Sequence, residues 1–88
     1  MANWFVYLLR CSDDTLYAGV TVDLERRVRE HNGEVGPQKG AKYTKARRPV
    51  SLVYYEVCLN RSAAQTREAA LRKLSRAEKR ILIDKMSL

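Results

Sequence analysis

The sequence predicts a small α+β domain in which helices flank a three-stranded antiparallel sheet, with the elements in the order ββαβαα. Two runs rich in aromatic and β-branched residues lie on either side of a polar tetrapeptide, which is typical of a β-hairpin. A third such run follows a loop with glycine and proline, and segments with helical apolar spacing accompany these runs. The 88 residues leave room for one domain, which we expect to span 1–88 with a motif-bearing core at about 4–83.

The hairpin is predicted from two strands and the turn between them. The strands are expected at Trp4–Cys11 and Leu16–Val20, and the polar residues 12–15 have the composition of a tight turn. The first strand is expected to be buried on both faces, because its apolar residues form a nearly continuous run. Gly19 in the second strand indicates either a β-bulge or a place where another group approaches the backbone closely.

A helix is predicted after the hairpin, and a loop after the helix. Thr21 or Asp23 is expected to cap the helix, which runs to about His31, and Asn32-Gly33 is a typical C-terminal stop. The apolar face of this helix carries Leu24, Val28 and His31. Residues 33–49 contain three of the four glycines and both prolines, so they are predicted to form a loop.

The third strand is expected at Val50–Leu59, where β-branched and aromatic residues are again abundant. A period of two residues separates its side chains into two faces. One face is expected to carry Leu52, Tyr54, Glu56 and Cys58, and the other Val53, Tyr55, Val57 and Leu59.

Two helices are predicted to complete the chain. They are expected to begin at two capping boxes, Ser62 with Gln65 and Ser75 with Glu78, and to end near Leu74 and Met86. Helical spacing from Ala64 to Leu71 places Glu68 at the edge of the packed face of the first helix. The apolar stripe of the second is expected to consist of Ile81, Leu82 and Met86.

Composition and charge restrict the classes of function. The 17 Lys and Arg residues outnumber the 10 Asp and Glu residues, so the formal net charge is +7 and a polyanion such as nucleic acid is the expected partner. Two cysteines and one histidine are too few for a disulfide scaffold or the usual Cys/His zinc site. The longest apolar run, Trp4–Leu9, is far shorter than the ~20 residues that cross a bilayer. We therefore expect a cytoplasmic protein without a membrane partner.

Four side chains in the first half of the chain are candidates for chemistry on a phosphate. Tyr7 and Tyr17 lie on neighbouring strands, where they either accept a proton or position water, or are half-buried sheet aromatics with satisfied hydroxyls. Arg27 and His31 share a helix face at i and i+4. They form either a phosphate grip with a proton relay, or a solvated arginine beside a histidine at the core edge.

Glu68 and the basic loop are the candidates for binding a metal and nucleic acid. Glu68 either supplies one oxygen to a hydrated Mg²⁺ or is a helix-surface residue paired with Arg72. The loop has no acidic residue from Val35 onward, and Tyr43 within it offers a ring that can stack on a base. The candidate nucleic-acid contacts are Lys39, Lys42, Tyr43, Lys45, Arg47 and Arg48.

Four motifs occur in a fixed order along the chain. They are Phe5-Val6-Tyr7, Tyr17-Ala18-Gly19, Thr21-x-Asp23-Leu24-x-x-Arg27-x-x-x-His31, and Glu68. Together they resemble the GIY-YIG nuclease superfamily, and most closely its small single-domain branch, the YhbQ-like (UPF0213) family. The segment Gly40-Ala41-Lys42-Tyr43-Thr44-Lys45-Ala46-Arg47-Arg48-Pro49 is similar to a characteristic loop of that branch.

The resemblance implies a role for each residue on one face of a three-stranded sheet. Glu68 is expected to hold a divalent metal, Mg²⁺ or Mn²⁺. Tyr7 would activate or position water, and Tyr17 would shape the site and contact the phosphate. Arg27 would stabilise charge on the scissile phosphate, and His31 would support proton transfer.

We therefore expect a metal-dependent endonuclease that hydrolyses phosphodiester bonds of nucleic acid, DNA rather than RNA, with a protein partner as a potential source of specificity. The alternative is a nucleic-acid-binding module without efficient catalysis, or an adaptor of a DNA-processing complex. Catalysis requires Tyr7, Tyr17, Arg27 and Glu68 to converge on one site.

Overall fold

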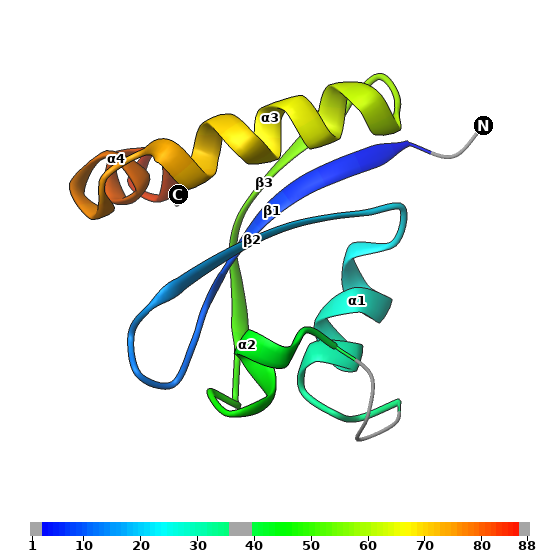
Figure 1. Cartoon of the computed structure of the whole chain (residues 1–88), viewed down its shortest axis with the longest axis vertical. Helices are drawn as coiled ribbons and strands as arrows, with labels where there is room; N and C mark the ends of the chain where they lie inside the picture. The colour runs from blue at the N-terminus through cyan, green and yellow to red at the C-terminus, as the bar shows by residue number, and fades with distance from the viewer. Residues whose placement is uncertain (1–2, 36–39, 87–88) are drawn as a thin grey trace.

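The computed structural model describes residues 3–35 and 40–86. Its elements are β1 (Trp4–Arg10), β2 (Leu16–Thr21), α1 (Leu24–His31), α2 (Lys42–Lys45), β3 (Ser51–Cys58), α3 (Arg61–Lys73) and α4 (Arg76–Met86) (Figure 1). The order contains one element more than predicted, because the basic loop includes the four-residue helix α2. The amides of Thr44 and Lys45 both donate to the Ala41 carbonyl, which closes this single turn. Thr44 is fully buried, so tertiary contacts hold a turn that is too short to persist alone.

The three strands form the antiparallel sheet that the sequence predicts, in the order β2-β1-β3. β1 is the central strand, and residues 6–9 of it are buried on both faces, as expected for its apolar run. The β1–β2 register is continuous and places Tyr7 opposite Gly19. Gly19 is therefore not at a β-bulge, which leaves close approach as the reason for a glycine there.

Two hydrophobic clusters occupy the two faces of the sheet. On one face Val6, Leu8 and Tyr54 pack with Leu71 of α3 and Ile83 of α4. On the other face the buried residues are Tyr7, Leu9, Cys11 and Val50, and Tyr17, Leu24 and Val28 pack against them. Figure 1 shows the same arrangement, with α3 and α4 on one side of the sheet and α1 and α2 on the other. No helix of residues 3–35 and 40–86 is long and apolar enough to span a membrane.

The predicted alternation in β3 is wrong at its start. Leu8 pairs with Tyr54 but Leu9 pairs with Leu52, so Val53 is an extra residue opposite this step of β1. Leu52 consequently lies on the same side as Leu9, opposite to Tyr54, and it is 36% exposed. An irregularity of this kind changes the period of two and leaves no mark in the composition.

The helix starts agree with the prediction in two of three cases. Asp23 caps α1 by accepting from the amide of Arg26, and the Ser75–Glu78 capping box opens α4. The box predicted at Ser62 is wrong, because Asn60 caps α3 through a 2.8 Å bond from the Ala63 amide to its Oδ1. Asn60 comes directly after β3 in an extended conformation, so the chain turns two residues earlier than expected.

The apolar stripe of α4 also differs from the prediction. Ile83 is buried against the sheet, with Leu82 and Met86 packed beside it. Ile81 is 55% exposed and lies outside this stripe. The prediction chose the wrong isoleucine because residues 82, 83 and 86 fit one helix face better than residues 81, 82 and 86.

Candidate active site

Tyr7 is at the centre of the candidate site and is almost completely buried. It extends from β1 across the neighbouring strand, so that its hydroxyl lies over the backbone of Gly19. A Cβ atom at position 19 would collide with the hydroxyl and with Cζ of the Tyr7 ring. The glycine is therefore required by the close approach of Tyr7, which confirms the second of the two interpretations of Gly19.

A chain of short hydrogen bonds connects Tyr7 to the loop. The Tyr7 hydroxyl lies 2.8 Å from Nε2 of His31, and Nδ1 of His31 lies 2.8 Å from Oγ1 of Thr44. Thr44 donates its one hydroxyl proton to the Ala41 carbonyl at 2.9 Å. Oγ1 must then accept from Nδ1–H, so proton counting leaves Nε2 as the acceptor for the Tyr7 hydroxyl. The amide of Ala41 makes only a long contact of 3.4 Å to Nδ1.

Burial determines the protonation states of the two titratable side chains in this hydrogen-bonded series, Tyr7 and His31. The pKa of His31 is lowered to about 4, chiefly by burial and also by the nearby charges of Arg27 and Arg48, while Glu30 opposes them. Burial also raises the pKa of Tyr7 to about 12, against the effect of the Arg27 guanidinium. At neutral pH Tyr7 is therefore a phenol and His31 a neutral imidazole that can accept a proton.

Arg27 lies beside the Tyr7–His31 pair. Its guanidinium donates to Glu30 Oε1 at 2.9 Å, and its charge acts on the Tyr7 hydroxyl. Arg26 donates to the second oxygen of Glu30 at 3.3 Å, so Glu30 holds both arginines on α1. Arg27 is partly buried and oriented by these contacts, unlike the solvated arginine of the alternative interpretation.

Two aromatic rings connect the buried pair of Tyr7 and His31 to the surface. The Tyr17 ring packs edge-on against His31, with centroids 5.3 Å apart, and stacks on Tyr43 at 5.9 Å. The Arg47 guanidinium covers Tyr43 at 3.9 Å from the ring centroid. Tyr43 is 37% exposed, so one edge of this stack is open to a ligand.

Glu68 lies on α3, the helix that covers the other face of the sheet. Its Oε2 accepts from Arg72 at 2.9 Å, as the surface-pair interpretation expected. Its side chain is nevertheless only 18% exposed, and its charge contributes to the raised pKa of Tyr7. Glu68 therefore forms the surface pair with Arg72, and its charge also acts on the Tyr7 hydroxyl.

The described residues contain no group of three or more His, Cys, Asp or Glu side chains that would enclose a metal ion. A hydrated Mg²⁺ or Mn²⁺ needs only one or two carboxylates, since it retains most of its waters. The single carboxylate of Glu68 fits that requirement and does not fit a fully protein-coordinated ion.

The predicted nucleic-acid contacts are divided between the surface and the interior. Lys42 and Lys45 are exposed on α2, and Arg47 pairs with Asp13 at 2.9 Å. Arg48 is directed inward, where its Nε donates to the His31 carbonyl at 2.5 Å. Lys39 lies outside the described residues.

Sequence reasoning missed the contribution of Thr44 and assigned Asn32 only a terminal role. The side-chain amide of Asn32 donates to the Val50 carbonyl at 2.9 Å and accepts from the Val50 amide at 2.7 Å. This pair of bonds joins the end of α1 to the start of β3 and encloses the loop that carries Thr44. The only sequence feature that could have drawn attention to Thr44 was its position as an uncharged residue in a strongly basic segment.

Residues 3–81, most of the chain, match the family model of the GIY-YIG catalytic domain. The chain belongs to the GIY-YIG family. This confirms the resemblance inferred from the four motifs. GIY-YIG domains are associated with nuclease activity on nucleic acid, and nucleases of this kind typically use a divalent metal.

Similar proteins place this GIY-YIG chain among proteins named UPF0213. One from Syntrophus aciditrophicus is 52% identical over 83 residues, which cover 94% of this chain and 92% of the relative. One from Desulfotalea psychrophila is 51% identical over 80 residues, which cover 91% of this chain and 70% of the relative.

Solved structures confirm the fold. The solution NMR structure of a UPF0213 protein from Bacillus halodurans is 35% identical, with a TM-score of 0.56 over 93% of this chain and 83% of that one. A protein from E. faecalis, also solved by NMR, is 35% identical with a TM-score of 0.60, over 98% and 91% of the respective chains.

Proposed function

We propose that this protein is a cytoplasmic, metal-dependent endonuclease that hydrolyses phosphodiester bonds of nucleic acid, DNA in preference to RNA. The observation that carries the proposal is the hydrogen-bonded chain from Tyr7 through His31 to Thr44, with Arg27 beside Tyr7. A buried phenol on a neutral imidazole, next to an oriented guanidinium, is suited to proton transfer at a phosphate.

The relay allows Tyr7 to act without becoming a free phenolate. Its hydroxyl proton moves to Nε2 of His31 while its oxygen takes a proton from the attacking water. The water oxygen forms the new bond to phosphorus, the bond to the leaving oxygen breaks, and that oxygen takes a proton from solvent. His31 ends as an imidazolium whose Nδ1–H still donates to Thr44, and the negative phosphate offsets the burial that lowers its pKa.

The other residues are assigned by what they contact. Arg27 would stabilise the charge that develops on the phosphate, with Glu30 fixing its orientation. Glu68 would hold the divalent ion, which when bound supplies neutralisation of charge at the phosphate. Tyr17, stacked between His31 and Tyr43, would shape the site and contact the phosphate.

The direct test is a panel of nicked, branched and single-stranded DNA and RNA, incubated with Mg²⁺ or Mn²⁺. Tyr7→Phe is expected to lower the cleavage rate at least ~100-fold, which is typical for loss of a proton-transfer group. Tyr55→Phe makes the same chemical change on an exposed ring outside the relay and should retain activity. Identical product profiles for the wild type and Glu68→Gln would disprove the proposed endonuclease activity.

The second candidate is a nucleic-acid-binding module or an adaptor for a protein partner, and the net charge of +7 favours binding. Exposed Lys42 and Lys45 on α2, beside the exposed edge of Tyr43, are suited to follow a sugar-phosphate backbone. If no substrate is cut, DNA affinity that falls when both lysines are changed to Gln supports this module. Affinity that does not change excludes α2 as the contact.

A further inference from the structure

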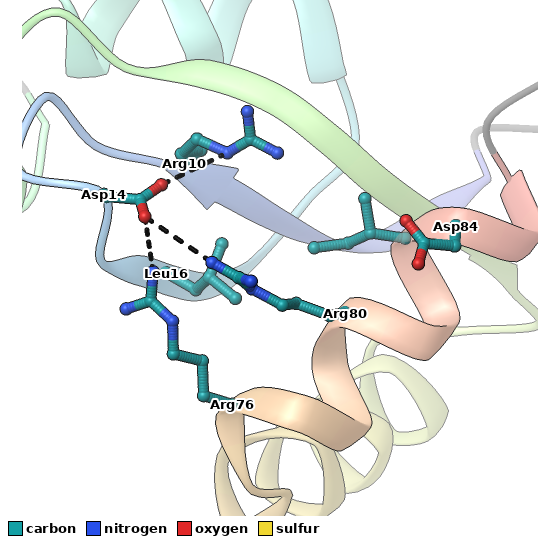
Figure 2. A pocket seen from close by; sticks show the side chains of 7 residues that line it. Arg10, Asp14, Leu16, Arg76, Arg80 and Asp84 are labelled. Atoms are coloured by element: carbon teal, nitrogen blue, oxygen red, sulfur yellow. Dashed lines mark hydrogen bonds and ion pairs between the residues drawn. The ribbon is translucent and has the colours of Figure 1, made fainter.

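A second cationic site lies between the β1–β2 turn and α4, on the side of the hairpin away from Tyr7. It is a cavity of about 340 Å³ (Figure 2). Three arginines and two aspartates line it together with an apolar floor, and they are Arg10, Arg76, Arg80, Asp14 and Asp84, with Leu16 in the floor. None of these residues has a part in the proposed nuclease chemistry.

One carboxylate receives three guanidinium groups in this cavity. Asp14 Oδ2 lies 2.5 Å from Arg76 and 3.6 Å from Arg80, and Oδ1 lies 3.8 Å from Nε of Arg10. Figure 2 shows dashed lines from all three arginines to Asp14, while Asp84 lies apart from them without a drawn interaction. Each guanidinium has five N–H donors, so a single carboxylate leaves most of them available. Three positive and two negative charges leave the cavity with net positive charge.

The position of Asp14 does not depend on the arginines. Its φ of 65° is in the left-handed region, and its amide donates to the Cys11 carbonyl at 2.9 Å. The turn is further fixed by Asp13, whose Oδ1 accepts from the Thr15 hydroxyl at 2.6 Å. All three arginine side chains are at least half exposed, and exposed ion pairs contribute little to stability. Folding alone therefore does not explain why three arginines converge here.

The cavity is connected to the candidate active site by direct contacts. Asp13, the neighbour of Asp14, pairs with Arg47 at 2.9 Å, and Arg47 covers Tyr43. Tyr43 stacks on Tyr17 beside His31. Arg47 therefore lies between the candidate site and the end of the hairpin, where Asp13 and Asp14 connect it to the arginine cavity.

We infer that the arginine cavity binds a backbone phosphate of the same nucleic acid that occupies the proposed nuclease site, so this inference rests on the proposed function. Guanidinium groups bind phosphate oxygens in pairs of parallel hydrogen bonds, which suits an oxyanion between Arg76 and Arg80. In the free protein Asp14 accepts a hydrogen bond from Arg76 and forms an ion pair with Arg80. The phosphate then competes with Asp14 for these donors, and the bound strand passes the end of the hairpin.

The first experiment measures the affinity for a 20-base-pair duplex by fluorescence anisotropy over a range of KCl concentrations. Arg76→Gln with Arg80→Gln is expected to weaken binding roughly tenfold and to reduce the salt slope by about one to two. The matched control removes two positive charges elsewhere, through Arg61→Gln with Lys85→Gln. Equal losses in the two double variants would overturn the site, because they would show a general charge effect only.

The second experiment asks whether the isosteric substitution Asp14→Asn raises or lowers the affinity for duplex DNA. Asp14→Asn keeps a side chain that tolerates the left-handed conformation and removes the competing charge. It is expected to raise duplex affinity by about threefold, since the neutral Asn side chain competes less strongly than Asp14 with the phosphate for the arginines. Weaker or unchanged binding by a variant with wild-type circular dichroism contradicts the proposal. If the variant does not fold, the arginine pair and the titration below decide.

The third experiment separates this site from the nuclease. The Nε–Hε signals of Arg76 and Arg80 are followed by NMR while inorganic phosphate is added at constant ionic strength, with chloride as the control. Phosphate-specific shifts in a protein that cleaves no substrate would support phosphate binding in the cavity and contradict the proposed endonuclease activity. If no shifts occur and the arginine variants bind the duplex as the wild type does, the cavity is not a phosphate site, and the proposed endonuclease activity is unaffected.

Discussion

Thr44 shows how much one residue contributes to the chemistry of the candidate site. It is fully buried, it accepts from Nδ1 of His31, and it passes its own proton to the Ala41 carbonyl. This arrangement leaves Nε2 free to accept from Tyr7. Without Thr44 the imidazole loses the contact that selects its tautomer, although the residue itself would touch neither water nor phosphate. Thr44 is a positioning residue in the proposed mechanism.

Thr44→Val is a nearly isosteric test of this role. It leaves the buried Nδ1–H without its partner, so we expect a loss of roughly 1–3 kcal/mol in the free energy of unfolding. The ¹⁵N chemical shifts of the His31 ring should show the other tautomer or a mixture of the two. Thr44→Ser retains the hydroxyl and should keep the wild-type ring shifts. Wild-type ring shifts in Thr44→Val would refute the assigned tautomer.

His31 also makes the stability depend on pH. Its pKa in the folded protein is about 4, below the ordinary value of 6.5, so the unfolded chain binds the proton more tightly. The contribution of neutral His31 is complete above pH 6.5 and decreases as the pH falls toward 4. Between pH 7 and pH 5 this group alone is expected to cost about 2 kcal/mol.

Urea unfolding at pH 7 and pH 5 measures this effect, with His31→Gln as the reference without an ionisable ring. The wild type should lose about 2 kcal/mol more than the variant over this interval. Equal losses would mean that the folded protein accommodates the imidazolium, and the proposed relay would then begin from a protonated histidine.

At the scale of the elements, two serines that look alike in the sequence have different roles. The amide of Glu78 donates to Oγ of Ser75, and the amide of Lys79 donates to its carbonyl, so Ser75 is the cap of α4. Ser62 lies within α3, after the cap at Asn60. We expect Ser75→Ala to cost about 1 kcal/mol, a decrease in Tm of roughly 4–8 °C for a domain of this size. Ser62→Ala should leave the Tm unchanged or slightly higher, because alanine favours a helix interior. Equal decreases would contradict the assignment of the caps.

These caps also show what the sequence could predict. The hairpin, the central buried strand and the Ser75 box follow from local composition, and each has the position expected of it. Asn60, the extra residue Val53 and the turn α2 depend on how β3 and the loop meet the rest of the molecule. The motifs singled out Tyr7 and His31 but did not predict the hydrogen bond between them. Thr44 remained hidden because its partner is 13 residues away and no spacing rule connects them.

At the scale of the whole molecule, the excess of positive charge should make nucleic-acid binding far more sensitive to salt than the stability of the fold. The ion pairs found among the described residues are mostly exposed, and in each of them at least one partner is partly accessible to solvent. Salt weakens these pairs, but it also reduces the repulsion within a chain of net charge +7. The two effects oppose each other, so the fold should respond weakly to ionic strength while contacts with phosphates respond strongly.

Raising KCl from 50 to 200 mM is therefore expected to change the free energy of unfolding by less than about 1 kcal/mol. With about four phosphate contacts, the affinity for duplex DNA should fall roughly a hundredfold over the same range. Urea unfolding and anisotropy on the same samples measure the two quantities. A large loss of stability would show that the basic residues are held by structural ion pairs. A flat affinity would show that the positive charge does not face the nucleic acid, and the proposed path around the hairpin would fail with it.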